Sequence, residues 1–343
     1  MDKKQKIVII ALLLALILVI LFALGLGAFY IPVGNVAKLL LYKVGFITVH
    51  PDLALQEDVL FIIRMPRVLL GLLVGAALGI SGAAIQGIFR NPLAEPGLIG
   101  ISSGASLFAV LIIAFESLLF VGIGQWLGYY LLAFGAFFGA GLTAFLVYQI
   151  AKKDGRTSVT TMLLAGIAIN AFAAALTGLM TYMATEQQLR TITFWMLGSL
   201  GGATWENTIA VAPFILLPLI ALPFFGKSLN AFALGEMQAD LLGTRTDVVK
   251  RSVVILSTLA VGASVSVSGI IGFVGLLVPH IVRLLAGVEH RYVLLASLLM
   301  GALVLTLADV IARTAVAPIE LPIGVITALL GTPVFLYILI KDK

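Results

Sequence analysis

The sequence of 343 residues contains no cysteine and only three histidines. Without cysteine the chain cannot form disulfide bonds, iron–sulfur clusters or thiolate metal sites. The histidines, His50, His280 and His290, lie far apart in the sequence and form no ligand-spaced pair. The sequence therefore indicates no metal or haem site within this chain.

Charged residues are also scarce: they make up 11% of the chain, whereas hydrophobic residues make up 61%. The mean hydropathy of +1.17 is far above what a water-soluble domain of this size tolerates. The net charge of +5 comes from basic residues scattered between apolar runs, with no basic tract or aromatic stacking platform. The composition predicts a polytopic protein of the lipid bilayer and gives no indication of nucleic-acid binding.

Ten charge-poor runs are long enough for transmembrane helices. They cover residues 7–29, 67–88, 97–115, 126–151, 158–184, 207–226, 251–268, 270–286, 292–313 and 322–340. The first run lacks a small-x-small cleavage site, so we expect an uncleaved span. Residues 252–282 carry no charge and would be about 46 Å long as one helix, so we expect a break at "SVSGIIG". The prediction is an all-α fold with one transmembrane domain, residues 1–343.

Lysine and arginine are unevenly divided between the two sides of these spans. Of the 21 basic residues, the side without the termini receives Lys38, Lys43, Arg64, Arg67, Arg190 and Arg313, and the other side receives the rest. Because cytoplasmic loops carry the excess of lysine and arginine, we expect both termini to be cytoplasmic.

A ridge of small residues, Gly71, Gly75, Gly79, Ala83 and Gly87, recurs at every fourth position of the second span. Such a ridge lets another helix approach closely. The pattern leaves open whether that helix belongs to the same chain or to a second subunit.

The predicted span centres carry no carboxylate or histidine, whereas ion-coupled carriers usually hold such residues there. Asp309 and Arg313 lie near a span end at i,i+4 spacing, which favours a local ion pair. An ion-coupled secondary carrier is therefore the less favoured alternative. No catalytic arrangement indicates an enzyme, and no G-x-x-x-x-G-K-[ST] loop is present to hold ATP phosphates. Uphill transport would need a separate ATPase.

The stretch "ALGEMQADLLG" is strongly polar for this chain. Apolar residues at helical spacing predict an amphipathic helix from Asn230 to Leu242, ended by Gly243. Anionic lipid would repel Glu236 and Asp240, so we favour a protein partner over a helix resting on lipid. The residues expected to contact that partner are Leu229, Phe232, Glu236, Met237, Asp240, Leu241 and Gly243.

The loop "FRNPLAEPGLIG", residues 89–100, lies on the same predicted side. Pro92 ends one helix, Pro96 suits the first turn of the next, and Glu95 stands where a helix N-terminus favours negative charge. Capping does not explain Asn91 and Leu93, which are free to face a pore.

Four segments closely resemble the FecCD-type permeases, the membrane subunits of bacterial ABC importers for ferric siderophores, haem and cobalamin. They are "RMPRVLLGLLVGAALGISGAAIQGIFRNPLAEPGLIGISSGAS", "GIIGFVGLLVPHIVRLLAG", "HRYVLLASLLMGALVLTLADVIAR" and "IELPIGVITALLGTPVF", and the resemblance covers residues 60–340. It implies a ten-helix subunit of type II ABC importer architecture in the bacterial cytoplasmic (inner) membrane.

The resemblance also implies partners. A second permease subunit, expected to be identical although a related chain is possible, forms the dimer around a central path. Two ATP-binding-cassette ATPase subunits bind ATP and magnesium, so this chain needs no cofactor and is no enzyme, and an extracytoplasmic solute-binding protein docks outside. The polar stretch after the sixth span would be the coupling helix. An iron-siderophore chelate is the expected cargo, with haem and cobalamin as alternatives.

By motif position, the resemblance assigns binding-protein docking to Arg64, Arg67 and Arg313, for the last two of which snorkelling at the membrane surface is the alternative. It assigns the cytoplasmic gate to Asn91, Leu93, Thr160 and Thr161, and for the two threonines helix capping competes. Asn170, in the middle of the fifth span, either lines the path or hydrogen-bonds a neighbouring helix.

Overall fold

The computed structural model describes residues 1–46, 51–119, 129–153, 156–317 and 319–341. His50 lies outside these ranges, and so do the first residues of the span predicted at 126–151. Nearly all described elements are helices, so the all-α prediction is confirmed. One short antiparallel ladder pairs Lys152 with Thr157 and Lys153 with Arg156.

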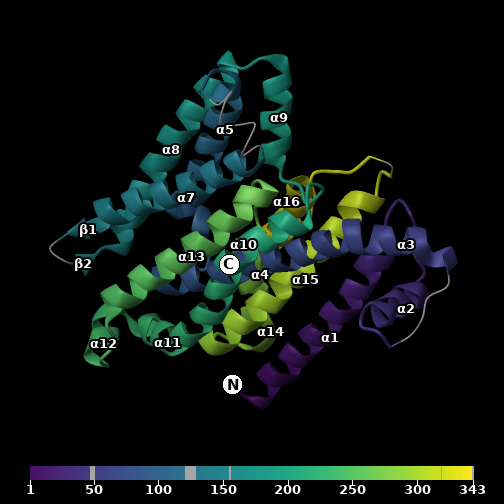
Figure 1. Cartoon of the computed structure of the whole chain (residues 1–343). Helices are drawn as coiled ribbons and strands as arrows, with labels where there is room; N and C mark the ends of the chain where they lie inside the picture. Colours follow the sequence, from purple (N-terminus) through teal and green to yellow (C-terminus); the bar gives the residue numbers. More distant parts are fainter. Residues whose placement is uncertain (47–50, 120–128, 154–155, 318, 342–343) are drawn as a thin grey trace.

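The elements follow one another in a simple order (Figure 1). They are α1 (Lys3–Gly25), α2 (Val33–Lys43), η1 (Pro51–Leu53), α3 (Ala54–Asp58), η2 (Val59–Arg64), α4 (Met65–Phe89), η3 (Pro96–Ile99), α5 (Ile101–Leu119), α7 (Tyr129–Ala151), β1 (Lys152–Lys153), β2 (Arg156–Thr157), α8 (Val159–Met183), α9 (Glu186–Leu197), α10 (Trp205–Ala221), η4 (Leu222–Phe225), α11 (Gly226–Leu234), α12 (Glu236–Leu241), α13 (Thr246–Ser268), α14 (Val274–Ala286), α15 (His290–Thr314) and α16 (Ile323–Lys341).

Seven helical stretches of the described chain are long and apolar enough to cross a membrane. They are Lys3–Gly25, Ala54–Phe89, Tyr130–Ala151, Val159–Met183, Trp205–Leu234, Thr246–Ser268 and His290–Thr314. Shorter apolar helices cover Ile101–Phe115, Val274–Ala286 and Ile323–Tyr337. Each predicted span overlaps one of these helices, while the count of ten membrane crossings stays a prediction.

The break predicted at "SVSGIIG" is confirmed. Helix α13 ends at Ser268, and Gly269 has φ 66°, a left-handed conformation that glycine adopts without strain. Helix α14 starts only at Val274 and has 13 residues, about 20 Å, which is shorter than the hydrocarbon core. The predicted eighth span at 270–286 is therefore too long, because its first residues form the connection between the helices.

Helix α4 lies at the centre of the bundle beside α15 (Figure 1). A Cβ atom added to Gly75 would lie 2.4 Å from the carbonyl oxygen of Gly301, and one on Gly79 would lie 2.2 Å from that of Ser297. The small-residue ridge thus lets the two backbones touch. This settles the alternative left open by the sequence for these two glycines, since the helix that they receive belongs to the same chain.

The helix ends gather at two opposite ends of the bundle. At one end, Gln5 Nε2 donates to the carbonyl of Ala286 at 3.2 Å, and Arg283 donates to Gln86 Oε1 at 2.6 Å. We call this the coupling end, and α11, α12 and the N-terminus also lie there (Figure 1). The opposite end, where Arg64 and Arg313 contact the last turn of α1, is called the arginine end.

Candidate functional site

The predicted single helix from Asn230 to Leu242 is wrong: the segment forms two helices, α11 and α12, which meet at Gly235. Gly235 has φ 125°, and a Cβ atom there would lie 2.0 Å from Gln238 Oε1. Only glycine fits this turn, so the chain changes direction although the amphipathic pattern continues across it. Gly243, with φ 82°, follows α12 as predicted.

The apolar residues of this segment divide into two groups. Leu229 and Phe232 are 0% and 1% exposed and belong to the hydrophobic core. They anchor α11 to the bundle, so their expected contact with a partner does not fit this structure. Met237 and Leu241 on α12 are 74% and 84% exposed. Helix α12 therefore presents an uncovered apolar surface at the coupling end.

A fully buried lysine joins α12 to the rest of the bundle. Lys250 Nζ lies 2.5 Å from Glu236 Oε1 and donates to the carbonyl of Thr157 at 2.5 Å. It also lies 3.2 Å from Asp247 Oδ1, which accepts a hydrogen bond from the Thr157 amide at 3.1 Å. We call these four residues the Lys250 cluster. A buried lysine needs such partners, and here they fix α12, α13 and the β2 segment to one another.

The second acidic residue of α12 is also held within the chain. Asp240 Oδ1 accepts a hydrogen bond from the Thr246 hydroxyl at 2.7 Å. Both carboxylates on which the sequence argument relied therefore position α12 on α13. The apolar surface offered to a partner consists of the side chains of Met237 and Leu241.

The predicted gate residues lie in two segments. Thr160 and Thr161 are exposed at the start of α8, where the Ser158 side chain accepts from the Thr161 amide at 3.3 Å. Ser158 is thus the N-cap, and the competing explanation of the two threonines as caps is wrong. In the other segment, Asn91 Oδ1 accepts from the Leu93 amide at 2.9 Å. The Leu93 side chain is 44% exposed.

A cavity of about 630 Å³ lies beside α8, η3 and α5, and none of the four predicted gate residues is among its lining residues. Helix α8 closes on η3 there, since a Cβ atom on Gly166 would lie 1.9 Å from the carbonyl oxygen of Leu98. The polar residues that line the cavity are Glu95, Ser102, Ser103, Ser106, Asn170, Thr177 and Thr181. The lining thus offers hydroxyl, amide and carboxyl groups without a histidine or tyrosine among the described residues.

Asn170 hydrogen-bonds neighbouring elements, which is one of the two roles that the sequence left open, while its role in the path stays a prediction. Its Nδ2 donates to the carbonyl of Gly97 at 3.1 Å, and its Oδ1 accepts from the Ser103 hydroxyl. The same side chain lines the cavity. Asn170 therefore holds α8 against η3 and α5 at the cavity wall.

Glu95 differs from its expected role at a helix N-terminus. It is the N-cap of η3, but its side chain makes no capping hydrogen bond. Burial raises the pKa of the Glu95 carboxyl, because the charged form loses hydration without gaining a partner. Pro96 occupies the first position of η3, as predicted.

The three predicted docking arginines are buried at the arginine end. Arg64 is 4% exposed and donates to the carbonyls of Leu24 and Gly25 at 2.6 Å each, and to that of Phe29. Arg313 donates to the carbonyl of Ala23 at 2.5 Å. These carbonyls belong to the C-terminal turn of α1 and the connection after it, and those of the last turn lack partners within the helix.

Arg67 lies in an ion-pair network. Its Nε donates to Asp309 Oδ1 at 3.0 Å, and its NH1 donates to Glu320 Oε1 at 2.8 Å. The predicted local pair of Asp309 and Arg313 is present at 3.4 Å. Snorkelling does not describe these arginines, since their guanidinium groups point into protein. Their role in docking stays a prediction.

The helical bundle, its polar-lined cavity and the exposed helix at one end define a membrane protein of the transport-permease class. The chain belongs to the FecCD transport family, which matches residues 14–341. The predicted family is confirmed, and with it the assignment as an ABC importer permease and not an enzyme.

Several relatives are similar over most of their length. The hemin transport system permease protein HmuU of Yersinia pestis is 43% identical over 282 residues, 82% of this chain and 83% of the relative. The cobalamin import system permease protein BtuC of Halobacterium salinarum is 41% identical, over 82% of this chain and 73% of the relative. An uncharacterized ABC transporter permease protein, YvrB of Bacillus subtilis, is 40% identical over 94% of this chain and 90% of the relative.

A solved structure shows the same fold. It is described as an inward-facing conformation of a metal-chelate type ABC transporter and is 31% identical to this chain. The match covers 98% of this chain and 99% of the solved chain, with a TM-score of 0.84. The type II ABC importer permease architecture is therefore confirmed.

Proposed function

We propose that this FecCD-family permease moves an iron-siderophore-type chelate, intact, across the bacterial cytoplasmic membrane. The observation that carries this proposal is the cavity beside Asn170, whose hydroxyl and amide groups suit hydrogen bonds to the periphery of a chelate. Its described lining contains no histidine, cysteine or tyrosine, and its one carboxyl, that of Glu95, is too few ligands to take the metal from its chelator. Haem and cobalamin, the cargoes that the names of two relatives give, are the alternatives.

The energy comes from two ATPase subunits, each of which seats against α12 of one of the two permease subunits at the cytoplasmic coupling end. They bind the ATP and magnesium, and this chain needs no cofactor of its own. The exposed Met237 and Leu241 supply apolar contact area, and the Lys250 cluster supports this coupling role because it ties α12 firmly to the bundle. A docking element must be fixed in this way to transmit a displacement.

The same cluster leads to the gate. Thr157, which Lys250 and Asp247 hold through its carbonyl and amide, directly precedes the Ser158 cap of α8. A shift of α12 is therefore passed to the start of α8, which carries Thr160 and Thr161; we assign these two residues, with Asn91 and Leu93, to the cytoplasmic gate. These residues open and close the path on the cytoplasmic side.

At the opposite surface, the solute-binding protein docks on the arginine end. Its carboxylates compete with Asp309 and Glu320 for Arg67 and Arg313, and Arg64 follows when the last turn of α1 moves. A second, identical permease subunit completes the path between the two chains. Both termini are cytoplasmic, as the distribution of basic residues favours.

Reconstitution tests this function. The permease, its ATPase and its binding protein are placed in proteoliposomes, and uptake of labelled ferric siderophore, haem and cobalamin is measured with and without ATP. We expect ATP-dependent uptake of ligand and metal in equal amounts for one chelate. Uptake driven by an ion gradient without ATP would instead support the secondary carrier, and uptake of metal without its chelator would contradict the cargo proposal.

A further inference from the structure

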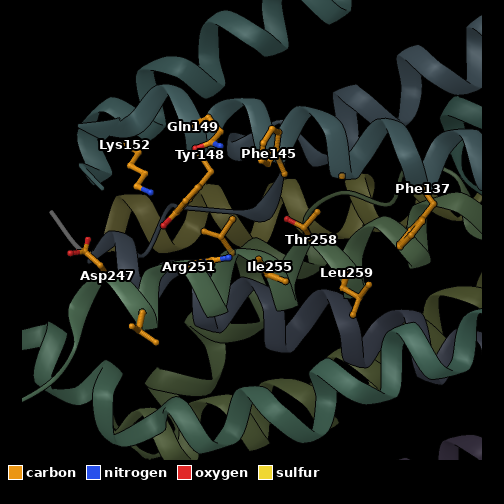
Figure 2. Close-up of a pocket in the computed structure, with 14 residues that line it drawn as sticks. Phe137, Phe145, Tyr148, Gln149, Lys152, Asp247, Arg251, Ile255, Thr258 and Leu259 are labelled. Carbon is orange, nitrogen blue, oxygen red and sulfur yellow. The ribbon is translucent and has the colours of Figure 1, made fainter. Parts of the chain in front are cut away.

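A second hollow lies between α7 and α13, apart from the cavity beside Asn170 (Figure 2). This groove encloses about 550 Å³. Lys152, Asp247 and Arg251 lie at one end of it, and Phe137 and Leu259 at the other (Figure 2). The groove thus changes from charged to apolar along the two helices, as the membrane does from its surface inward.

The charged end retains positive charge for a ligand. Lys152 and Arg251 are exposed, and neither has an ion-pair partner among the described residues. Asp247 contributes one negative charge at this end, and its Oδ1 accepts from the Thr157 amide and lies 3.2 Å from Lys250 Nζ. Since Lys250 also pairs with Glu236, the two carboxylates and the three basic side chains leave a net charge of +1 there. A phosphate with one negative charge, placed between Lys152 and Arg251, would therefore balance this excess positive charge.

The remainder of the groove suits a hydrocarbon chain. Phe145 and Ile255 are 55% and 53% exposed on its walls, and both belong to helices long and apolar enough to cross a membrane. At Gly141 an added Cβ atom would meet nothing within 4 Å, which leaves open space in the middle of the groove.

The length of the groove matches one leaflet. From Phe137 to Lys152 it follows α7 for about 20 Å. One leaflet contributes about 15 Å of the hydrocarbon core, and the headgroup adds the rest. A lipid that stands with its phosphate at Lys152 therefore reaches the apolar end with its tail.

We propose that the groove is a binding site for one anionic phospholipid from the leaflet at the coupling end. The lipid phosphate lies between the Lys152 and Arg251 side chains, and one acyl chain follows Phe145 and Ile255 toward Phe137. This site is separate from the transport path and involves neither the gate nor the arginine end.

Lipid retention measured by native mass spectrometry tests the site. The full chain is purified from vesicles of equal parts phosphatidylglycerol and phosphatidylcholine, and the lipids that remain bound are counted. We expect one phosphatidylglycerol per chain in the wild type. The double variant Lys152→Gln/Arg251→Gln should bind it about 30-fold more weakly, because each basic residue near a membrane surface contributes about fivefold.

Two further variants separate the groove from general surface charge. Lys227→Gln/Arg291→Gln removes the same charge from exposed positions at the coupling end outside the groove, and it should retain the lipid. Gly141→Leu keeps both basic residues but fills the space for the acyl chain, and it should lose the lipid. If Lys227→Gln/Arg291→Gln lost as much phosphatidylglycerol as the groove variant, or if Gly141→Leu retained all of it, the proposal would be overturned.

A second copy of the chain is the competing occupant. Because the sequence lacks cysteine, Ile255→Cys introduces a single thiol into the groove. We expect this variant to remain uncrosslinked under mild oxidation in the same vesicles. An efficient disulfide-linked dimer would show that another chain covers the groove, and would contradict the lipid site.

Discussion

Lys250 Nζ and Glu236 Oε1 lie 2.5 Å apart, although the lysine is fully buried in α13 and the glutamate begins the exposed helix α12. Glu236 retains 38% of its side-chain exposure. The pair therefore joins a partner-facing surface to the interior of the bundle. Through the carbonyl of Thr157, it also reaches the residue before the cap of the proposed gating helix.

Glu236→Gln should weaken this connection without removing α12. We expect uptake per ATP hydrolysed to fall several-fold, because the motion of α12 reaches α8 less faithfully. Stability should fall by about 1–3 kcal/mol, less than for a fully buried pair, since Glu236 and Asp247 are partly exposed. We call uptake per ATP hydrolysed the coupling ratio. Lys250→Arg, which keeps the charge, should retain more of the wild-type coupling ratio than Lys250→Met. An unchanged coupling ratio in both Glu236→Gln and Lys250→Met would contradict the role of the cluster.

Met237→Glu combined with Leu241→Glu should weaken association with the ATPase at least tenfold, because two charges would enter an apolar contact. The protein itself should remain stable, as both side chains are exposed. Association is measured by pull-down or surface-based binding with the purified ATPase. Val288→Glu, at an exposed apolar position between α14 and α15 at the coupling end, is the control and should have little effect. Wild-type affinity in the double variant would exclude α12 as the docking surface.

The sequence predicted the apolar helices well because long charge-poor runs have few alternatives in a membrane. It failed at Gly235, where the amphipathic pattern continues through a turn that depends on one positive φ. Periodicity also could not distinguish Leu229 and Phe232, which pack inside, from Met237 and Leu241, which do not. Both groups are apolar at helical spacing, and only their neighbours decide which is covered.

The polar contacts were harder to predict. The charge pattern places Lys250 only among the basic residues of the cytoplasmic side, although its i,i+3 spacing from Asp247 is a signal for a local pair. Its other partners are distant in the sequence. The acceptors of Arg64 are backbone carbonyls around the end of α1, which no sequence pattern can pair with a particular arginine.

Glu320→Gln should increase affinity for the binding protein by about two- to fivefold. The Glu320 side chain is 45% exposed and forms one ion pair with Arg67, so its removal frees part of that guanidinium for an incoming carboxylate. Binding is measured by calorimetry with the purified binding protein at two salt concentrations. Glu186→Gln, an exposed carboxyl at the start of α9, controls for general charge and should change affinity much less. Equal affinity gains in both variants would exclude a specific role of Arg67.

The raised pKa of Glu95 predicts a pH dependence of stability. The folded protein binds the Glu95 proton more tightly than the unfolded chain, so this contribution is present at low pH and is lost as pH rises through the raised pKa. Glu95→Gln should therefore unfold at a higher temperature than wild type at pH 8, and the difference should shrink toward pH 5. The other cavity-lining residues are uncharged. Parallel melting curves for the two proteins across this range would contradict the burial of a charge there.

Gly79→Ala should destabilise the contact of α4 with α15. The new Cβ atom would lie 2.2 Å from the carbonyl oxygen of Ser297, a backbone atom that cannot turn aside, so the two helices must separate. We expect a loss of about 1–3 kcal/mol, typical of overpacking. Gly178→Ala in α8 is the matched control, because a Cβ atom there meets nothing within 4 Å and alanine favours the helix. Thermal unfolding in detergent should therefore move in opposite directions for the two variants, and a shared direction would contradict direct backbone contact between α4 and α15.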